Sequence, residues 1–466
     1  MATGPRCDKS HSSSNRLVDA PTADPGQDGV VSELPSDAFT RGLKLAALPL
    51  SFAGRAAIGL GKRVGGQSAE LVIAEFQSRT ADQMFKVLGE LKGGAMKVGQ
   101  ALSVLEAALP EEIAKPYRAT LTKLQEAAPP LPVERVHAVL SYELGPDWRA
   151  DFIEFDDLPA AAASIGQVHK AIWHTGAPVA VKIQYPGADK ALAGDLSNAG
   201  RLAKLFSPWI PGLDLNPLLD ELNDRIIEEL DYLQEAEFQN KFADAFNDTE
   251  FQVPRVLKST QHVLISEWLD GRPLADVIAQ GTQAERDHAG ALYQRFLLAG
   301  PARVGLLHAD PHPGNFRITS DGRLGVLDYG AVARLPGGFP PSIGALLAIA
   351  MRDDSAAVRD GLAAEGFIKP GVELDERSLL AYLAPFTEPA ETETFTYSRE
   401  WMRKQFNRVN DPRNPDFVVG MKLNLPPNYL LIHRVWLGSI GVMCQLGATV
   451  PARREIEKWL PGFTLV

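Results

Sequence analysis

Cysteine is scarce in this sequence, and long uninterrupted hydrophobic runs are missing. Two cysteines, Cys7 and Cys444, among 466 residues cannot form a disulfide framework or a four-ligand zinc site. The two most apolar stretches, 43–60 and 435–450, are either interrupted by charges and a proline or shorter than the roughly 20 residues that span a bilayer. The first residues also lack the apolar segment of a secretory signal. We therefore expect a cytoplasmic protein without transmembrane helices.

A general excess of basic residues is missing as well. The net charge of −11 argues against a protein that works by coating nucleic acid. Residues 38–66 depart from this balance, because they hold basic and apolar side chains but no acid. Such a segment either packs on its own domain or lies on an anionic membrane surface, such as the inner face of the membrane, and both interpretations stay open. Its bases are Arg41, Lys44, Arg55, Lys62 and Arg63.

The order of sequence patterns predicts a mixed α and β protein. Residues 1–37 are rich in Ser, Pro, Asp and Gly, which is typical of a disordered leader. A helical pattern covers 67–144, strands are predicted over 151–187, and apolar residues recur at three or four over 217–246, as in a helix. From 272 to the end the chain is predicted to be mostly helical. We expect 430–450 to be a core helix.

The stretch 308–330 holds the strongest functional signal. Asp310 lies five residues before Asn315 and eighteen before Asp328, which is the spacing of the catalytic and metal-binding loops of kinase-like sites. Asp310 would orient the attacking group, while Asn315 and Asp328 would hold Mg²⁺ on the nucleotide phosphates. The alternative is a turn-rich loop with ordinary polar residues.

A second set of candidates lies in the predicted strands. Lys182 ends a Val-Ala-Val strand, as does the kinase lysine that binds the α- and β-phosphates. The loop before it lacks the usual glycines and is built from small residues instead. A kinase-like site pairs this lysine with a helix glutamate, and Glu229 is the candidate; Glu267 lies where a nucleotide hinge belongs. The small residues are Ala161, Ala162, Ala163 and Ser164.

Together these segments resemble the ABC1/UbiB family of atypical kinases, from about residue 41 to the C-terminus. Lys97-Val98-Gly99-Gln100 is similar to the family's KxGQ signature, and 229–235 to its E-x-D-[FY]-x-x-E-A motif. The resemblance implies that the KxGQ segment folds over the site, with Lys97 and Gln100 at the nucleotide and Glu235 tethering Lys97. It also implies bound ATP or ADP with Mg²⁺, and ATPase or small-molecule kinase activity.

The resemblance implies an α+β, protein-kinase-like fold of two lobes. We expect the leader at 1–37, a helical N-terminal extension with the KxGQ motif at 38–145, the N-lobe at 146–270 and the C-lobe at 271–466. The implied partners are a nucleotide, a prenyl-lipid or quinone precursor and lipid-biosynthesis enzymes, and no nucleic acid. Two alternatives remain: a phosphotransferase of the aminoglycoside or choline kinase type, and a non-catalytic nucleotide-binding scaffold.

Overall fold

A five-stranded antiparallel sheet forms the first part of the fold. The computed structural model describes residues 130–163, 165–188, 216–217, 220–221, 227–248, 250–411 and 413–464. In the sheet the strands lie in the order β1 (Phe152–Ala163), β2 (Gly166–Trp173), β3 (Pro178–Gln184), β6 (Val263–Glu267) and β5 (Val256–Ser259). The strands predicted over 151–187 are thus confirmed. Gly176 lies in the turn that connects β2 to β3 and has a φ of 91°.

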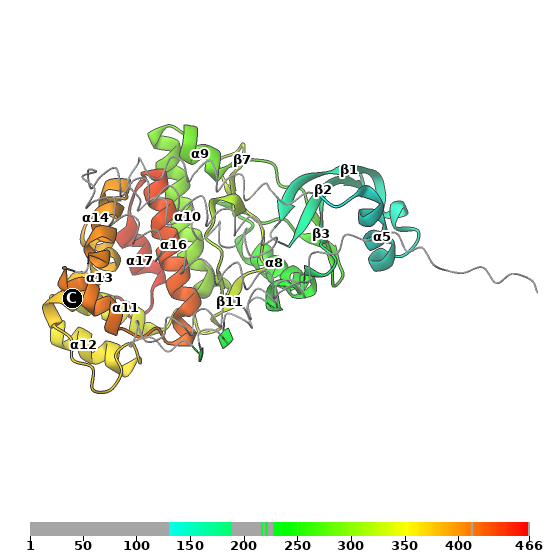
Figure 1. The fold of residues 1–466 in the computed structure, drawn as a ribbon. Helices are drawn as coiled ribbons and strands as arrows, with labels where there is room; N and C mark the ends of the chain where they lie inside the picture. The colour runs from blue at the N-terminus through cyan, green and yellow to red at the C-terminus, as the bar shows by residue number, and fades with distance from the viewer. Residues whose placement is uncertain are drawn as a thin grey trace, which may run out of the picture. The chain divides into compact units, whose positions relative to one another are not determined.

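The two faces of this sheet are covered by different helices. Helix α5 (Val133–Leu144) packs Val136 and Leu140 on one face, in a core shared with Val181 and Ile183 of β3. On the other face Tyr232 of helix α8 (Tyr232–Phe246) packs with Leu264 of β6. Figure 1 shows α5 beside β1 to β3. The boundary expected at residue 145 therefore divides one packed unit, because α5 shares the core of the sheet.

Helix α8 begins later than the pattern at 217–246 predicts. Asp231 has extended backbone angles, and its side chain accepts hydrogen bonds from the backbone N–H groups of Leu233 and Gln234. This is the geometry of an aspartate at a helix N-cap, which satisfies N–H groups that have no partner in the first turn. Residues 227–229 are helical but are followed by a turn at Leu230. The regular spacing of apolar residues over 217–246 thus continues across the start of α8, so the pattern does not mark one continuous helix.

The second part of the fold is mostly helical, as expected. Small sheets accompany the helices: β4 (Phe251–Gln252), β10 (Leu324–Val326), β9 (Phe316–Ile318) and β7 (Arg272–Pro273) form one, β8 (Leu306–His308) pairs with β11 (Val332–Arg334), and β12 (Phe395–Thr396) with β13 (Thr449–Val450). The helices are α9 (Leu274–Gln280), α10 (Gln283–Val304), α11 (Pro341–Ala350), α12 (Ser355–Ala364), α13 (Glu376–Glu391), α14 (Arg399–Asn410), α15 (Pro415–Lys422), α16 (Leu430–Leu446) and α17 (Ala452–Trp459).

Helix α10 lies in the middle of this helical part and contacts α8, α16, α17 and β8. A capping box of Thr282 and Glu285 begins it, and Gly305, in the left-handed region with a φ of 69°, ends it. Its Tyr293 and Phe296 are fully buried in the largest core. Strand β8 leaves that core directly toward the predicted catalytic loop, so the loop is attached to rigid structure.

Helix α16 is a core helix, as predicted. Together with the short 3₁₀ turn η5 (Pro427–Tyr429) it is, among the described residues, the one helix long and apolar enough to cross a membrane by length and composition. However, 61% of its most apolar stretch is buried inside the protein. Its neighbours α10 and α14 account for that burial, so its apolar composition is explained by packing.

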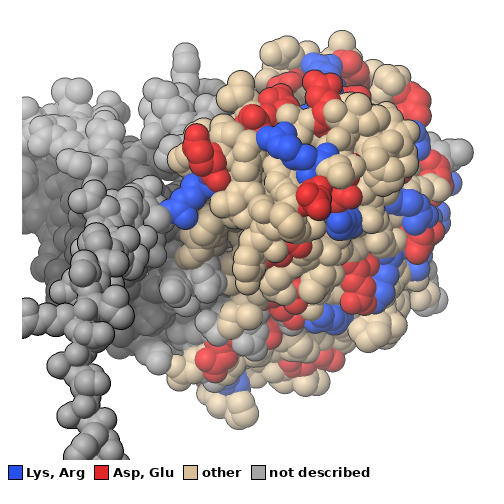
Figure 2. Space-filling view, turned by 90° about the vertical axis from the view of Figure 1, so that its right-hand side faces the viewer, with Lys and Arg blue, Asp and Glu red and all other residues tan. Residues whose placement is uncertain are grey.

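The surface charges of the described residues are mixed. In Figure 2 basic and acidic side chains alternate over the face shown, and the described residues form no broad area of one sign there. The basic segment at 38–66 and the KxGQ motif lie outside the described residues, as do the leader and Ser164.

Candidate active site

The predicted catalytic loop is a tightly bonded turn at the end of β8. Asp310 is only 5% exposed, and the side-chain amide of Asn315 donates to the backbone oxygen of Asp310 at 3.3 Å. Asn315 ends the short 3₁₀ turn η4 (Pro313–Asn315), and its own backbone oxygen accepts from Leu327 N at 2.8 Å. The hydroxyl of Tyr293 in α10 donates to Pro311 O at 2.7 Å. These bonds fix the loop from both sides.

Asp328 is brought to the same place by the short strand β10, all three residues of which are buried. Its backbone has a φ of 58°, in the left-handed region that Asp and Asn tolerate better than other side chains. The Nε2 of buried His308 donates to Asp328 O at 2.8 Å, and Gly330 N donates to the Asp328 carboxylate at 3.1 Å. Both the backbone and the side chain of Asp328 are thereby oriented.

Lys182 meets two carboxylates, one from each part of the fold. Its Nζ donates to the Glu235 oxygens at 2.6 and 2.9 Å and lies 3.5 Å from Asp328 Oδ1. Burial acts to lower the pKa of Lys182, but the charges of Asp328 and Glu235 outweigh burial and raise it. The ring of Tyr232 lies 5.0 Å below the ammonium group. Lys182 is therefore a fixed positive charge.

The expected pairing of Lys182 with Glu229 is wrong. The structure gives no hydrogen bond or ion pair between these two described residues, and Glu235 occupies the position instead. The physical reason is the cap at Asp231: Glu235 lies in the first turn of α8, which packs on the sheet, whereas Glu229 lies before the cap. The continuous helix assumed from the apolar period placed the two glutamates incorrectly.

Glu235 also contacts the Asp328 loop directly. Tyr329 N donates to Glu235 Oε1 at 3.3 Å, while Lys182 is bound to the same carboxylate. Glu235 is 2% exposed. One buried carboxylate therefore joins strand β3 to the loop after β10. The tether to Lys97 that the resemblance implies involves a residue outside the described ones.

The small residues before β2 are not a free loop but the end of a long hairpin. Ala161, Ala162 and Ala163 belong to β1, and Ala163 pairs with Gly166. Ala161 pairs with Val168, which in turn pairs with Lys182. These pairings put Ala161 in the same cross-strand row as Lys182, two strand spacings or about 10 Å away. The alanines thus line the sheet beside the lysine, while Ser164 lies outside the described residues.

Gly166 is required by the close approach of β2 to the neighbouring strand β3. A Cβ at Gly166 would lie 2.2 Å from the backbone oxygen of Ile183, a distance that no side chain could tolerate.

Glu267, the residue expected at the nucleotide hinge, ends β6 and is exposed. Its carboxylate accepts a hydrogen bond from Arg255 N at 2.9 Å. Its role as a nucleotide contact stays a prediction. Lys97 and Gln100 lie outside the described residues.

Sequence reasoning missed Arg434. Its guanidinium lies 3.6 Å from Asp310 Oδ1, although the two residues are far apart in the chain. Helix α16 also approaches the loop closely, since a Cβ at Gly438 would lie 2.5 Å from Pro311 Cγ. A signal was present: Arg434 is the only Asp, Glu, Lys or Arg in the seventeen residues of α16. A lone charge in an apolar core helix has to face a partner or solvent.

The oxygen groups of this site suit a magnesium nucleotide. The Asn315 amide nitrogen is bound to Asp310 O, which leaves its side-chain oxygen as the atom that could ligate a cation. The Asp328 carboxylate supplies a charged oxygen, and Lys182 a fixed positive charge for phosphate. Among the described residues no three His, Cys, Asp or Glu side chains cluster as a metal cage. Mg²⁺ is usually held by one or two carboxylates together with substrate phosphates.

Comparisons with known proteins agree on one family. The model of the ABC1 atypical kinase-like domain matches residues 123–361. The chain is 32% identical over 265 residues to AarF domain-containing protein kinase 1 of Mus musculus and 31% identical over 287 residues to the atypical kinase coq-8, mitochondrial, of Caenorhabditis elegans. These alignments cover 54% and 59% of this chain and 49% and 37% of the relatives. The chain thus spans about half the length, or less, of these relatives.

A solved structure is more similar. The chain is 44% identical to Rv3197 from Mycobacterium tuberculosis, whose structure was described as a complex with erythromycin. The match covers 85% of this chain and 99% of that one, with a TM-score of 0.64. The family model alone covers just over half of the sequence. On these matches and the kinase-like geometry of its site, the chain belongs to the ABC1/UbiB family of atypical kinases.

Proposed function

We propose that this protein binds ATP with Mg²⁺ and transfers the terminal phosphoryl group to water or to a small molecule. The observation that carries the proposal is the convergence of Lys182 and Asp328 on one side of the site, joined through Glu235. Phosphoryl transfer needs mainly positioning and charge neutralisation. Lys182 supplies a fixed positive charge, and Asn315 and Asp328 supply two oxygen ligands. Asp310 is a buried aspartate on a loop that hydrogen bonds hold in place.

Each side chain has a distinct role in the proposal. Lys182 binds the phosphates, and Glu235 holds its ammonium group in place. Asn315 and Asp328 hold the magnesium ion, which when bound neutralises phosphate charge. Asp310 orients the attacking hydroxyl or water and accepts its proton. Arg434 is a positioning residue, because its guanidinium limits the directions in which the Asp310 carboxylate can turn.

The biological setting of the proposal comes from the family resemblance. It is isoprenoid quinone or other prenyl-lipid metabolism, with contact to an anionic membrane through 38–66 and a location on the inner face of that membrane. Sedimentation with anionic vesicles tests this part: deletion of residues 1–66 should lower the bound fraction. Equal sedimentation of the full-length and shortened proteins would remove the membrane contact from the proposal.

Phosphate release from ATP, measured with and without Mg²⁺, tests the catalytic part. Asp310→Asn should lower the rate at least a hundredfold while nucleotide still binds, because general-base groups contribute factors of about 10² to 10⁴. Asp328→Asn should lose the magnesium-dependent part of nucleotide binding. Asp244→Asn, at an exposed carboxylate of α8, is the matched control and should behave as the wild type.

The possible results separate catalysis from binding alone. Full phosphate release by Asp310→Asn would remove Asp310 from the reaction. Magnesium-dependent binding without release by the wild-type protein, with water or with small-molecule acceptors, would favour a nucleotide-binding scaffold.

A further inference from the structure

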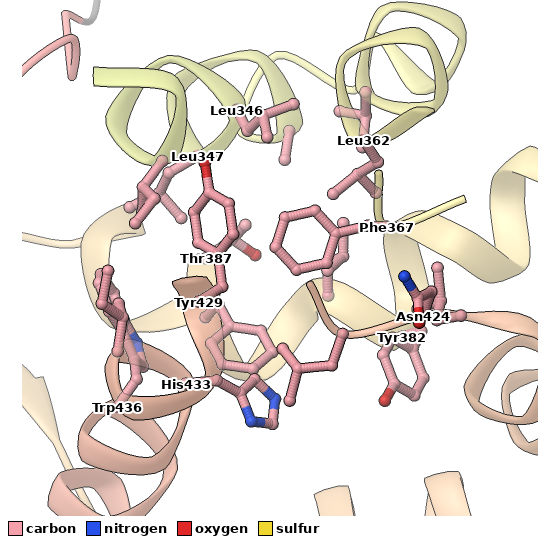
Figure 3. A pocket seen from close by; sticks show the side chains of 18 of the residues that line it. Leu346, Leu347, Leu362, Phe367, Tyr382, Thr387, Asn424, Tyr429, His433 and Trp436 are labelled. Carbon is pink, nitrogen blue, oxygen red and sulfur yellow. The ribbon is translucent and has the colours of Figure 1, made fainter. Parts of the chain in front are cut away.

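The helical part of the fold contains an apolar cavity that is partly open to solvent. It has a volume of about 330 Å³ and lies between α11, α12, α13, α15 and α16. Figure 3 shows its wall, with Leu347, Leu362 and Phe367 on one side and Tyr429, His433 and Trp436 of the η5–α16 segment on another. The described residues of the proposed phosphate site, Lys182, Asp310, Asn315 and Asp328, are not among those that line it.

The size and composition of this cavity are those of a ligand site. Protein cores are packed about as densely as organic crystals, and spaces larger than a water molecule are few. Small-molecule sites are mostly apolar and begin at about 300 Å³. Most of the lining side chains here are aliphatic or aromatic.

Three polar side chains in the wall have no hydrogen-bond partner among the described residues: His433, Tyr382 and the indole N–H of Trp436. The other polar groups are engaged: the Tyr429 hydroxyl bonds to Glu365 and Ser342, the Asn424 amide to Gly366 O, and the Thr387 hydroxyl to Ala384 O. Burial lowers the pKa of His433, which keeps the imidazole neutral. A neutral imidazole can either donate or accept one hydrogen bond at each nitrogen.

We propose that this cavity binds a neutral, largely apolar molecule of two or three rings that carries one hydrogen-bonding group directed at His433. Aromatic walls such as Phe367 and Trp436 favour a ring-containing body. A charged ligand is excluded, because the wall provides no charged side chain to compensate its loss of hydration. The site is separate from the proposed nucleotide site, and this inference does not depend on phosphoryl transfer.

The test uses N-phenyl-1-naphthylamine as the probe, in the absence of nucleotide. This neutral molecule has aromatic rings and one N–H group, and its fluorescence rises in apolar surroundings. The full-length protein should bind one molecule saturably, with fluorescence energy transfer from tryptophan because Trp436 lines the cavity. Leu383→Trp, which adds a ring to the partly buried α13 wall, should lower the affinity at least tenfold.

His433→Leu tests the hydrogen bond separately and is expected to fold, since it removes a polar group that has no partner. It should weaken probe binding about three- to tenfold, the value of one neutral hydrogen bond. The affinity for 1-benzylnaphthalene, a competitor of similar shape without the N–H, should not fall. Leu437→Ala, at an exposed position of the same helix, is the matched control and should bind like the wild type.

Two results would overturn the inference. One is probe fluorescence that never saturates and is equal in all four proteins, which indicates surface adsorption. The other is full affinity in both Leu383→Trp and His433→Leu. If Leu383→Trp loses its cooperative thermal unfolding, the comparison of the two naphthalenes in His433→Leu decides alone.

Discussion

A single buried carboxylate, Glu235, holds together elements that come from distant parts of the sequence. It accepts two hydrogen bonds from Lys182 of β3 and one from Tyr329 N after β10. Removing one partner of a buried ion pair is costly, because the remaining charge stays in a low-dielectric environment. Glu235 therefore affects both stability and the position of the lysine.

Glu235→Gln should destabilise the protein by about 1–3 kcal/mol and weaken nucleotide binding, because the amide leaves Lys182 only the Asp328 charge. Glu229→Gln is the matched control, since Glu229 makes no contact with Lys182. Urea unfolding and titration with a fluorescent ATP analogue measure the two effects. An equal loss in both variants would contradict the assignment of Glu235 as the partner.

For single residues, the sequence predicts which side chains lie together when they are close in the chain. Asp310, Asn315 and Asp328 could be found because their spacing reflects one loop and one short strand. The partner of Lys182 was assigned incorrectly, since an aspartate cap interrupts an apolar period that continues across it. The contact of Arg434 with Asp310 depends on how α16 packs, which no local pattern contains.

Among the elements, helix α16 is the support of the catalytic loop. Gly438 lies against the ring of Pro311, with no room for a Cβ, and Arg434 reaches Asp310 one turn earlier. That 430–450 would form a core helix was predictable from composition, and the helix observed covers Leu430–Leu446. The elements that pack against α16 could not be predicted, because an apolar helix can pack against any apolar surface.

Gly438→Ala should therefore reduce phosphate release more than it reduces stability. The added methyl group must displace either the helix or the catalytic loop, and overpacking of this kind costs about 1–3 kcal/mol. Part of that cost is offset by the higher helix propensity of alanine, worth about 1 kcal/mol. Leu437→Ala, one position away and exposed, controls for changes to the helix itself. Wild-type turnover in Gly438→Ala would show that the loop tolerates movement of α16.

For the whole molecule, the α+β class and the helical C-terminal part agree with the sequence prediction. Hairpins connect β1 to β2, β2 to β3 and β5 to β6, but the pairing of β3 with β6 joins distant parts of the sequence and follows from no local turn. Helix α5 precedes the boundary expected at 145 yet packs in the core of the sheet that follows, because a helix that precedes a sheet in the sequence can still complete its core. Sequence periodicity gives the apolar face of α5 but not the surface that covers it.

Two buried histidines, His169 and His308, and the partly buried His433 predict how the stability of the molecule depends on pH. Burial lowers the pKa values of His169, His308 and His433. Below about pH 6.5 the unfolded chain therefore binds more protons than the native protein, and the free energy of unfolding falls as the pH decreases. Each fully buried histidine contributes at most about 1.4 kcal/mol per pH unit.

Urea unfolding at pH 7.5, 6.5 and 5.5 measures this dependence. The midpoint should change little between the first two values and fall clearly at the third. His433→Leu should make the decrease of the urea midpoint smaller, by the contribution of one histidine. His174→Leu, at an exposed histidine of the β2–β3 turn, should leave that decrease unchanged. A midpoint that stays constant down to pH 5.5 would contradict the assignment of neutral buried histidines.

The two surfaces of α16 have a thermodynamic consequence. One surface closes the apolar cavity through Tyr429 of the adjoining η5 turn, His433 and Trp436, and the other touches the loop that carries Asp310. Suppose that a ligand in the cavity binds more tightly when α16 is shifted in one direction. Because α16 touches the loop that carries Asp310, such a ligand changes the affinity for nucleotide by some factor. Detailed balance then requires the nucleotide to alter the affinity of that ligand by the same factor. The cavity would thus act as a sensor of the nucleotide state as much as a means of controlling it.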